Sequence, residues 1–110
     1  MQLSRPKFLK KGDLIEYIAP SYGTTTEPYA TRMNVADENF KKWGFLTSFG
    51  PNVYRNDGVV ASASPEERAN EAMDAFRGDA SLVLSVGGGE TMDEILPYLD
   101  FAALKRLPPK

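Results

Sequence analysis

Short runs of apolar, strand-forming residues alternate along this chain with stretches in which apolar residues recur at the spacing of a helix. Three runs predict strands, at 13–19, 45–49 and 81–86, and each ends in a loop that contains proline or glycine. The third run is almost wholly apolar, which is typical of a strand buried in a parallel sheet. Residues 53–54 and 59–60 are shorter, and we expect a loop or an edge strand at each.

The stretch after the first strand has helical spacing. From Tyr29 its apolar residues recur three or four positions apart as far as Trp43, so they fall on one stripe of a helix. We expect this stripe to pack on a sheet, with Phe40 and Trp43 in the core, and Gly44 to act as the C-cap.

A second helix has a strong start signal. Ser64 is a typical N-cap, Pro65 suits the first helical turn, and Glu67 stands three residues after Ser64, where it closes a capping box. Apolar residues then share one helical face as far as Phe76, and Gly78 ends the helix.

The predicted elements follow the order strand, helix, strand, helix, strand, glycine loop, helix. This alternation predicts an α/β fold in which helices flank a parallel sheet and the crossovers are right-handed. In open sheets of this kind the ligand crevice lies outside the carboxyl ends of the strands. Both Pro20-Ser21 and the glycines at 87–89 fall there, so we expect these two loops to line one site.

Three consecutive glycines, Gly87 to Gly89, follow the third strand. Their N–H groups can approach a ligand closely, and we expect residues 91–96 to begin a helix whose unpaired N–H groups favour a negative oxygen. A phosphate or an oxyanion suits this place, and a tight turn without a ligand is the alternative. A dinucleotide-binding loop needs its glycines just after the first strand, where this chain has only Gly23. A P-loop needs a lysine after its glycines, where this chain has Glu90. The sequence therefore favours neither of these nucleotide-binding motifs.

The composition removes several classes of function. The chain has no histidine and no cysteine, so it cannot by itself assemble a Ser-His-carboxylate triad, a thiolate nucleophile or a histidine-containing metal site. A net charge of −2 gives no electrostatic footprint for nucleic acid. No apolar stretch is long enough to span a bilayer, and no signal-peptide core opens the chain. We expect a cytoplasmic protein with no cofactor, metal ion, nucleic-acid or membrane partner.

The last segment predicts that a further element follows it. Asp100 can cap a short helical turn at 101–104, and Pro108-Pro109 then close the helix and direct the chain outward. Such a pair commonly leads into a strand, and none follows. We therefore expect the chain to be cut before its next element, and residues 1–110 to self-associate as a homodimer through an unpaired edge or face.

Five segments also occur together in a known family, in the same order and over nearly the whole chain. They are Leu9-Lys10-Lys11-Gly12-Asp13-Leu14-Ile15, Ala19-Pro20-Ser21, Ala63-Ser64-Pro65-Glu66-Glu67-Arg68-Ala69, the strand into Gly88-Gly89, and Ile95-Leu96-Pro97-Tyr98-Leu99-Asp100-Phe101. With these segments the chain resembles the N-terminal domain of the L,D-carboxypeptidase family of serine peptidases, which includes the microcin-immunity proteins.

The resemblance implies a two-domain enzyme with a small peptide substrate, in which residues 1–110 are the N-terminal α/β domain. Such an enzyme cleaves an amide bond next to a terminal carboxylate, in murein tetrapeptides or in peptide-nucleotide antibiotics. It implies that the nucleophilic serine follows a Pro-Lys pair like Pro109-Lys110, with its glutamate and histidine partners in a second domain. It also implies that backbone N–H groups of Gly88 or Gly89 form the oxyanion hole. Glycine suits this role, because a main-chain donor must come within about 3 Å of the oxygen.

Two side chains near the glycine loop are candidates for substrate binding. Ser21 can touch a substrate carboxylate or simply cap a helix or loop. Glu90, where family members often carry an aromatic residue, can bind a substrate ammonium or remain a solvated carboxylate at a helix start. Ser85 has no base beside it in the sequence and is not expected to be a nucleophile. The rival interpretation is a non-catalytic module in which the glycine loop and Ser21 hold a carboxylate or phosphate.

Overall fold

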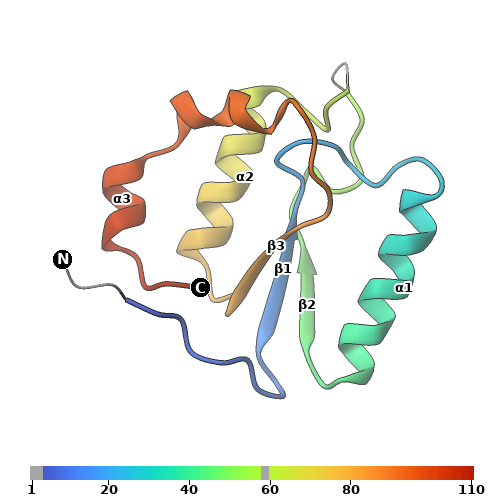
Figure 1. Cartoon of the computed structure of the whole chain (residues 1–110), viewed down its shortest axis with the longest axis vertical. Helices are drawn as coiled ribbons and strands as arrows, with labels where there is room; N and C mark the ends of the chain where they lie inside the picture. Colours follow the sequence, from blue (N-terminus) through green and yellow to red (C-terminus); the bar gives the residue numbers. More distant parts are fainter. Residues whose placement is uncertain (1–3, 58–59) are drawn as a thin grey trace.

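The computed structural model of the chain describes residues 4–57 and 60–110. Its central element is a sheet of three parallel strands in the order β2-β1-β3 (Figure 1). These strands are β1 (Leu14–Ile18), β2 (Leu46–Phe49) and β3 (Leu82–Ser85). The predicted α/β fold with a parallel sheet flanked by helices is confirmed.

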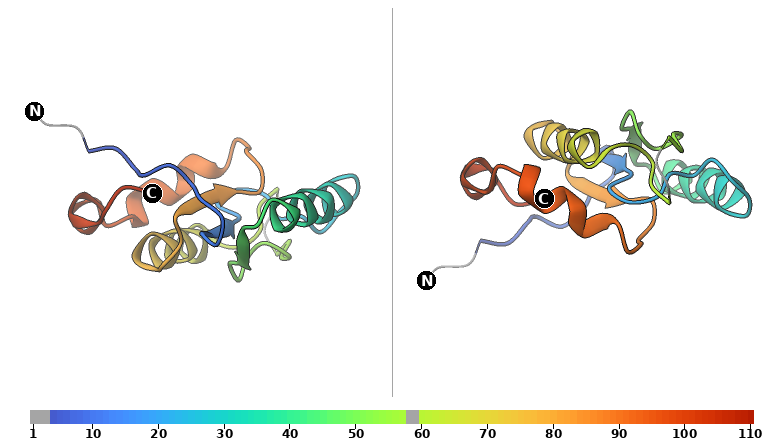
Figure 2. Two further views of the ribbon diagram at one scale, coloured as in Figure 1. Left: turned by 90° about the horizontal axis from the view of Figure 1, so that it is seen from below. Right: turned by 90° about the horizontal axis from the view of Figure 1, so that it is seen from above.

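Two helices cover opposite faces of the sheet, α1 (Tyr29–Lys42) and α2 (Pro65–Arg77) (Figure 2). This arrangement follows from the strand order. The crossover from β1 to β2 and the crossover from β2 to β3 run in opposite directions across the sheet, and right-handed crossovers in opposite directions lie over opposite faces. The predicted capping box is present at the start of α2. The hydroxyl of Ser64 accepts a hydrogen bond from the N–H of Glu67 at 3.2 Å, and the Glu67 carboxylate accepts one from the N–H of Ser64 at 3.1 Å.

The helix expected after the glycine loop is a 3₁₀ helix, η1 (Met92–Tyr98). Pro97 lies inside it, and proline has no N–H to continue an α-helical ladder and clashes with the carbonyl four residues back. The next helix, α3 (Phe101–Arg106), is longer than the predicted turn. Its cap is as expected, since the Asp100 carboxylate accepts a hydrogen bond from the N–H of Ala103 at 2.9 Å.

Two expectations about the core are wrong. Trp43 is 59% exposed, because it is the C-cap residue of α1, at the end of the helix. Its ring meets Phe40, which is half-buried against the core, in a T-shaped arrangement. Gly44 follows Trp43 at φ +94° and reverses the chain. The strand β3 is half-buried rather than buried, because it lies at an edge of the sheet.

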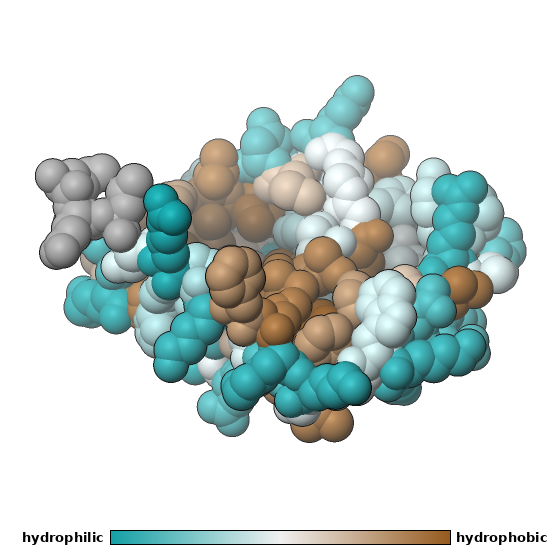
Figure 3. Space-filling model, turned by 60° about the horizontal axis from the view of Figure 1, so that its bottom comes forward, coloured by the Kyte–Doolittle hydropathy of each residue, from teal (hydrophilic) through white to brown (hydrophobic). Residues whose placement is uncertain are grey.

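Figure 3 shows apolar side chains gathered in the middle of one face of the molecule, with hydrophilic ones around them.

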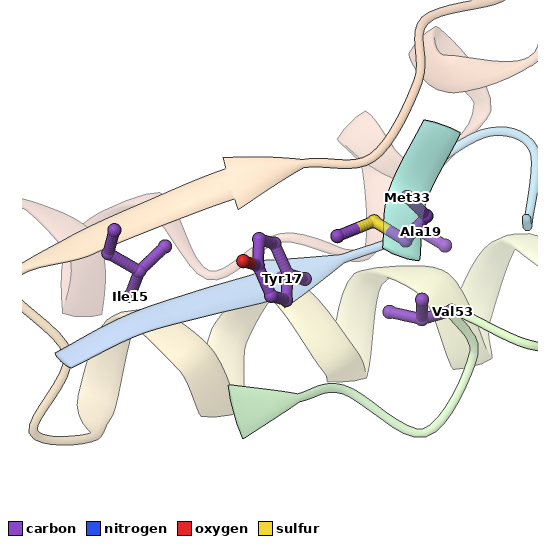
Figure 4. Close-up of a cluster of buried hydrophobic side chains, with 5 residues drawn as sticks. All are labelled: Ile15, Tyr17, Ala19, Met33 and Val53. Carbon is purple, nitrogen blue, oxygen red and sulfur yellow. The ribbon is translucent and has the colours of Figure 1, made fainter. Parts of the chain in front are cut away.

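The principal core lies between β1 and α1 (Figure 4). Its buried members are Ile15, Tyr17, Ala19, Met33 and Val53. Val53 comes from a turn after β2, so residues 53–54 are a loop and not an edge strand. In the other short pair, 59–60, Val59 lies outside the described residues.

The carboxyl-terminal residue is tied to the segment between α2 and β3. The ammonium group of Lys110 donates hydrogen bonds to the carbonyls of Gly78 at 2.7 Å and Ala80 at 2.6 Å. This end of the chain therefore lies near the amino ends of the strands, opposite the loops that follow them (Figure 1). In the part of the chain that the structure describes, no helix is long and apolar enough to cross a membrane.

Candidate active site

The loops after β1 and β3 meet at the carboxyl edge of the sheet. In an open sheet of order 2-1-3 the crossovers from neighbouring strands diverge between β1 and β3, and ligands bind at this switch point. Here the two loops are joined directly, because the hydroxyl oxygens of Ser21 and Thr91 lie 3.0 Å apart. The backbone topology therefore brings the predicted Pro20-Ser21 loop and the glycine loop together.

A cavity of about 490 Å³ opens between these loops. Such a volume is within the range of small-ligand pockets. The first loop contributes Ser21, Tyr22 and Gly23, and the other lining residues are Tyr29, Val60 and residues 86–89. The structure thus places Ser21 and the three glycines in the walls of one cavity. Glu90 is exposed just beyond that wall.

Ser21 is buried, with 1% of its surface exposed, and it does not cap a helix. The helix α1 begins eight residues later, with Pro28 at its N-cap position. Instead the Ser21 carbonyl accepts a hydrogen bond from the N–H of Ser62 at 2.8 Å, and its hydroxyl contacts Thr91. Ser21 therefore connects three loops at the mouth of the cavity.

The glycine loop packs tightly at one of its positions and is open at the others. Gly89 has φ +153°, and a Cβ atom there would lie 2.5 Å from the Ser21 hydroxyl oxygen. At Gly87 and Gly88 an added Cβ would meet nothing within 4 Å. Glycine is therefore required at Gly89 by its backbone angle and its contact with Ser21, whereas the other two glycines leave the backbone uncovered on the cavity side.

The N–H groups of the glycine loop have no acceptor among the residues that the structure describes. Among residues 4–57 and 60–110, no atom accepts a hydrogen bond from the N–H of Gly87, Gly88 or Gly89. The hydroxyl of Ser85, which is exposed and not buried as expected, donates to the Gly87 carbonyl at 2.7 Å. Because C=O and N–H point in opposite directions across a trans peptide, this bond turns the N–H of Gly88 away from Ser85. The loop thus presents oriented N–H groups that donate to no described residue, and such groups can bind an anionic oxygen.

Two tyrosines beside the cavity were not singled out by the sequence. Tyr22 and Tyr29 have ring centroids 6.5 Å apart, and both line the cavity. Their rings give one wall an aromatic surface with polar hydroxyl tips, which suits both apolar and hydrogen-bonding parts of a ligand. The available signal was the place of Tyr22, which directly follows Ser21 in the loop after β1.

A buried carboxylate on α2 holds the loops that follow β1 and β2. The two oxygens of Glu71 accept hydrogen bonds from the N–H groups of Ala19 and Asn52, each at 2.6 Å. Burial raises the pKa of the Glu71 carboxyl above its ordinary value of 4.5, and the two N–H donors act against that rise. The sequence carried a signal for this role, since Glu71 falls on the helical face shared by Ala72 and Ala75.

Within the described residues, no group of three or more acidic, histidine or cysteine side chains is placed to hold a metal ion. What the arrangement offers is a set of backbone donors, two hydroxyls and an aromatic wall. A cavity with these groups, at the switch point of an open parallel sheet, has the geometry of a small-ligand site in α/β proteins.

The chain belongs to a family that this geometry fits. Residues 15–110 match the family described as the LD-carboxypeptidase N-terminal domain, and this match covers most of the chain. A provisionally named carboxypeptidase of Treponema pallidum (strain Nichols) is 31% identical over 101 residues, which are 91% of this chain and 29% of that protein. The expected family is therefore confirmed.

Several solved structures are similar over most of the chain. The microcin C7 self immunity protein MccF, in complex with aspartyl sulfamoyl adenosine, has a TM-score of 0.84 and 26% identity, over 99% of this chain and 32% of that one. An MccF-like protein from Bacillus anthracis str. Ames has a TM-score of 0.81 and 27% identity, over 94% and 31%. A muramoyltetrapeptide carboxypeptidase from Oxalobacter formigenes, at 24% identity over 83% and 29%, shares the fold with a TM-score of 0.60. The chain spans about a third of the length of these relatives.

Proposed function

We propose that this chain supplies the oxyanion hole and part of the substrate pocket of a serine-type L,D-carboxypeptidase-like peptidase. The observation that carries the proposal is the glycine loop, whose N–H groups donate to no described residue and which lines the cavity at the switch point. Membership of the LD-carboxypeptidase N-terminal domain family supports the same reaction class. The bond cleaved is an amide next to a terminal carboxylate.

In this proposal the N–H groups of Gly88 and Gly89 stabilise the negative oxygen that forms when a nucleophile adds to the scissile carbonyl. Donors of this kind contribute about 10²- to 10³-fold to kcat, because they are already oriented when the charge develops. Ser21 and Glu90 stand on either side of the loop as substrate-binding groups. Ser21 can donate its hydroxyl to the substrate carboxylate, and Glu90 can accept from a substrate ammonium.

The nucleophile and its base lie outside residues 1–110 in this proposal. The chain has no histidine, so a Ser-Glu-His triad needs residues from a second domain. The chain by itself is then inactive, because oxyanion donors and a pocket without nucleophile and base leave only a small residual rate. A murein tetrapeptide and a peptide-nucleotide antibiotic are the two substrate classes, and the names of similar structures support both.

The test is hydrolysis by a longer protein in which this chain is followed by the second domain. We expect release of D-alanine from an L,D-tetrapeptide, or of an amino acid from an aminoacyl sulfamoyl nucleoside, detected by mass spectrometry. The 110-residue chain under the same conditions is expected to release neither. Release above the buffer background by the 110-residue chain alone would contradict the assignment of the catalytic groups to another domain.

The free donors also fit a second function, that of a non-catalytic module that binds a carboxylate or phosphate. Calorimetric titration of the 110-residue chain with D-alanine, acetate and inorganic phosphate separates the two. The module predicts saturable binding that is lost in Ser21→Ala, and it predicts no hydrolysis by the longer protein. Hydrolysis by the longer protein would rule the module out.

A further inference from the structure

Arg68 is buried in the middle of the molecule and takes no part in the proposed chemistry. Only 1% of its surface is exposed, although it lies in the first turns of the helix α2. Arginine is almost never fully buried unless its charge is paired or its donors are satisfied. The hydrogen bonds of the guanidinium must therefore offset the free energy that its removal from water costs.

Its hydrogen bonds reach three separate loops. The Nε atom donates to the Ala63 carbonyl at 2.9 Å, just before α2. The Nη1 atom donates to the carbonyls of Pro20 at 2.9 Å and Thr91 at 2.7 Å, and the Nη2 atom donates to the Glu94 carboxylate at 2.8 Å. One rigid group thus joins the loop after β1 to the segment that follows the glycine loop.

These contacts flank the candidate site on both sides. Pro20 immediately precedes Ser21, and Thr91 follows Gly89 by two residues and meets the Ser21 hydroxyl at 3.0 Å. A shift of either loop would change the distance between Ser21 and the glycine N–H groups. The contact at Gly89, where a single added atom would clash with Ser21, leaves little room for such a shift.

We propose that Arg68 is a positioning residue for the candidate site, whose guanidinium sets the glycine loop in place relative to Ser21. The proposal rests on the proposed function for its effect on catalysis, but its effect on the two loops is independent of any reaction. Arginine is suited to this role because its planar fork holds five donors in fixed directions. Lysine offers a single ammonium on a flexible stem, and it cannot reach all of these oxygens at once.

The first experiment measures how firmly the loops are held in the 110-residue chain. Amide hydrogen exchange by NMR reports on the N–H of Ser62, which donates to Ser21, and on the N–H of Glu94, which donates to Thr91. In Arg68→Gln we expect both amides to exchange about 10-fold faster or more, relative to amides inside α1. Arg68→Lys is expected to fall between Arg68→Gln and the wild type. Arg77→Gln, at an exposed arginine in the last turn of the same helix, is the matched control.

The second experiment measures hydrolysis by the longer protein with the same variants. We expect Arg68→Gln to lower kcat about 10- to 100-fold with KM changed less than about threefold, since displaced donors act on the transition state. Arg68→Lys is expected to recover part of kcat, and Arg77→Gln to keep all of it. If Arg68→Gln does not fold, the Arg68→Lys variant decides both experiments, with a smaller change of the same sign.

Unchanged exchange at Ser62 and Glu94 in Arg68→Gln would overturn the proposal, and so would an equal change in Arg77→Gln. Faster exchange with unchanged kcat would also overturn it, because the loops would then move without effect on the site. If the wild-type longer protein hydrolyses no substrate, the proposed function fails, and the exchange rates still decide whether Arg68 positions the loops.

Discussion

The Gly89→Ala substitution tests whether the glycine loop is held against Ser21 as the structure shows. The new Cβ would lie 2.5 Å from the Ser21 hydroxyl oxygen, at a backbone angle of φ +153°. An ordinary contact needs about 3.5 Å, so the two groups must separate by about 1 Å. The substitution therefore combines a local displacement with a strained backbone angle.

Both effects have known magnitudes. A non-glycine residue at a sparsely populated positive φ costs about 1–3 kcal/mol of stability. A displacement of about 1 Å at a catalytic group lowers kcat about 100-fold, which corresponds to about 2.7 kcal/mol in activation free energy. We therefore expect Gly89→Ala to lower the free energy of unfolding of the 110-residue chain and the kcat of the longer protein.

Two further variants separate the causes, with urea unfolding as the assay. Gly88→Ala places its Cβ in open space and is expected to leave the free energy of unfolding within about 1 kcal/mol of the wild type. Ser21→Ala combined with Gly89→Ala removes the clashing oxygen but keeps the strained angle, so it is expected to be less destabilised than the sum of the two single variants. Equal unfolding free energies for Gly89→Ala and Gly88→Ala would refute the reasoning.

Three other predictions concern the scaffold. Ser64→Ala removes the capping box of α2 and is expected to lower the free energy of unfolding by about 1 kcal/mol in urea. An equal decrease in Glu66→Ala, at an exposed residue of the same turn, would contradict this prediction. Burial raises the pKa of Glu71 in the folded chain, so the wild type should lose stability relative to Glu71→Gln as pH rises from about 4.5 through the folded pKa. If the two proteins differ in unfolding free energy by the same amount at every pH from 4 to 8, the shift is contradicted. The isolated chain should self-associate at micromolar concentration through an edge of its sheet, and a monodisperse monomer in light scattering at every dilution would contradict this.

Much of the fold was predictable because its signals are local. The capping box at Ser64, the helical spacing from Tyr29 and the strand-forming runs each depend on neighbouring residues, and the structure confirms the elements that they predict. The failures have equally local causes. The helix expected from residue 91 is of the 3₁₀ type and contains Pro97. Trp43 shared the apolar spacing of the stripe but fell at the helix end.

The candidate site was predictable only as two separate loops. Alternation of strands and helices implied that the Ser21 loop and the glycine loop lie at the same edge of a parallel sheet. No local signal showed that Ser21 would be buried, or that its hydroxyl would lie 3.0 Å from that of Thr91. Its roles as a cap and as a ligand group could not be separated, because both need the same residue type in the same kind of loop.

The sequence by itself determined the fold class, the family and the absence of a histidine-based triad from these residues, because periodicity, ordered motifs and composition are properties of the chain. Only the tertiary structure decided which groups hold the site together. Arg68 and Glu71 are charged residues of one helix, yet both are buried and bind loops that lie far from them in the sequence. Their roles depend on the strand order β2-β1-β3, which brings the loops within reach of one helix, and that order arises from packing across the whole sheet.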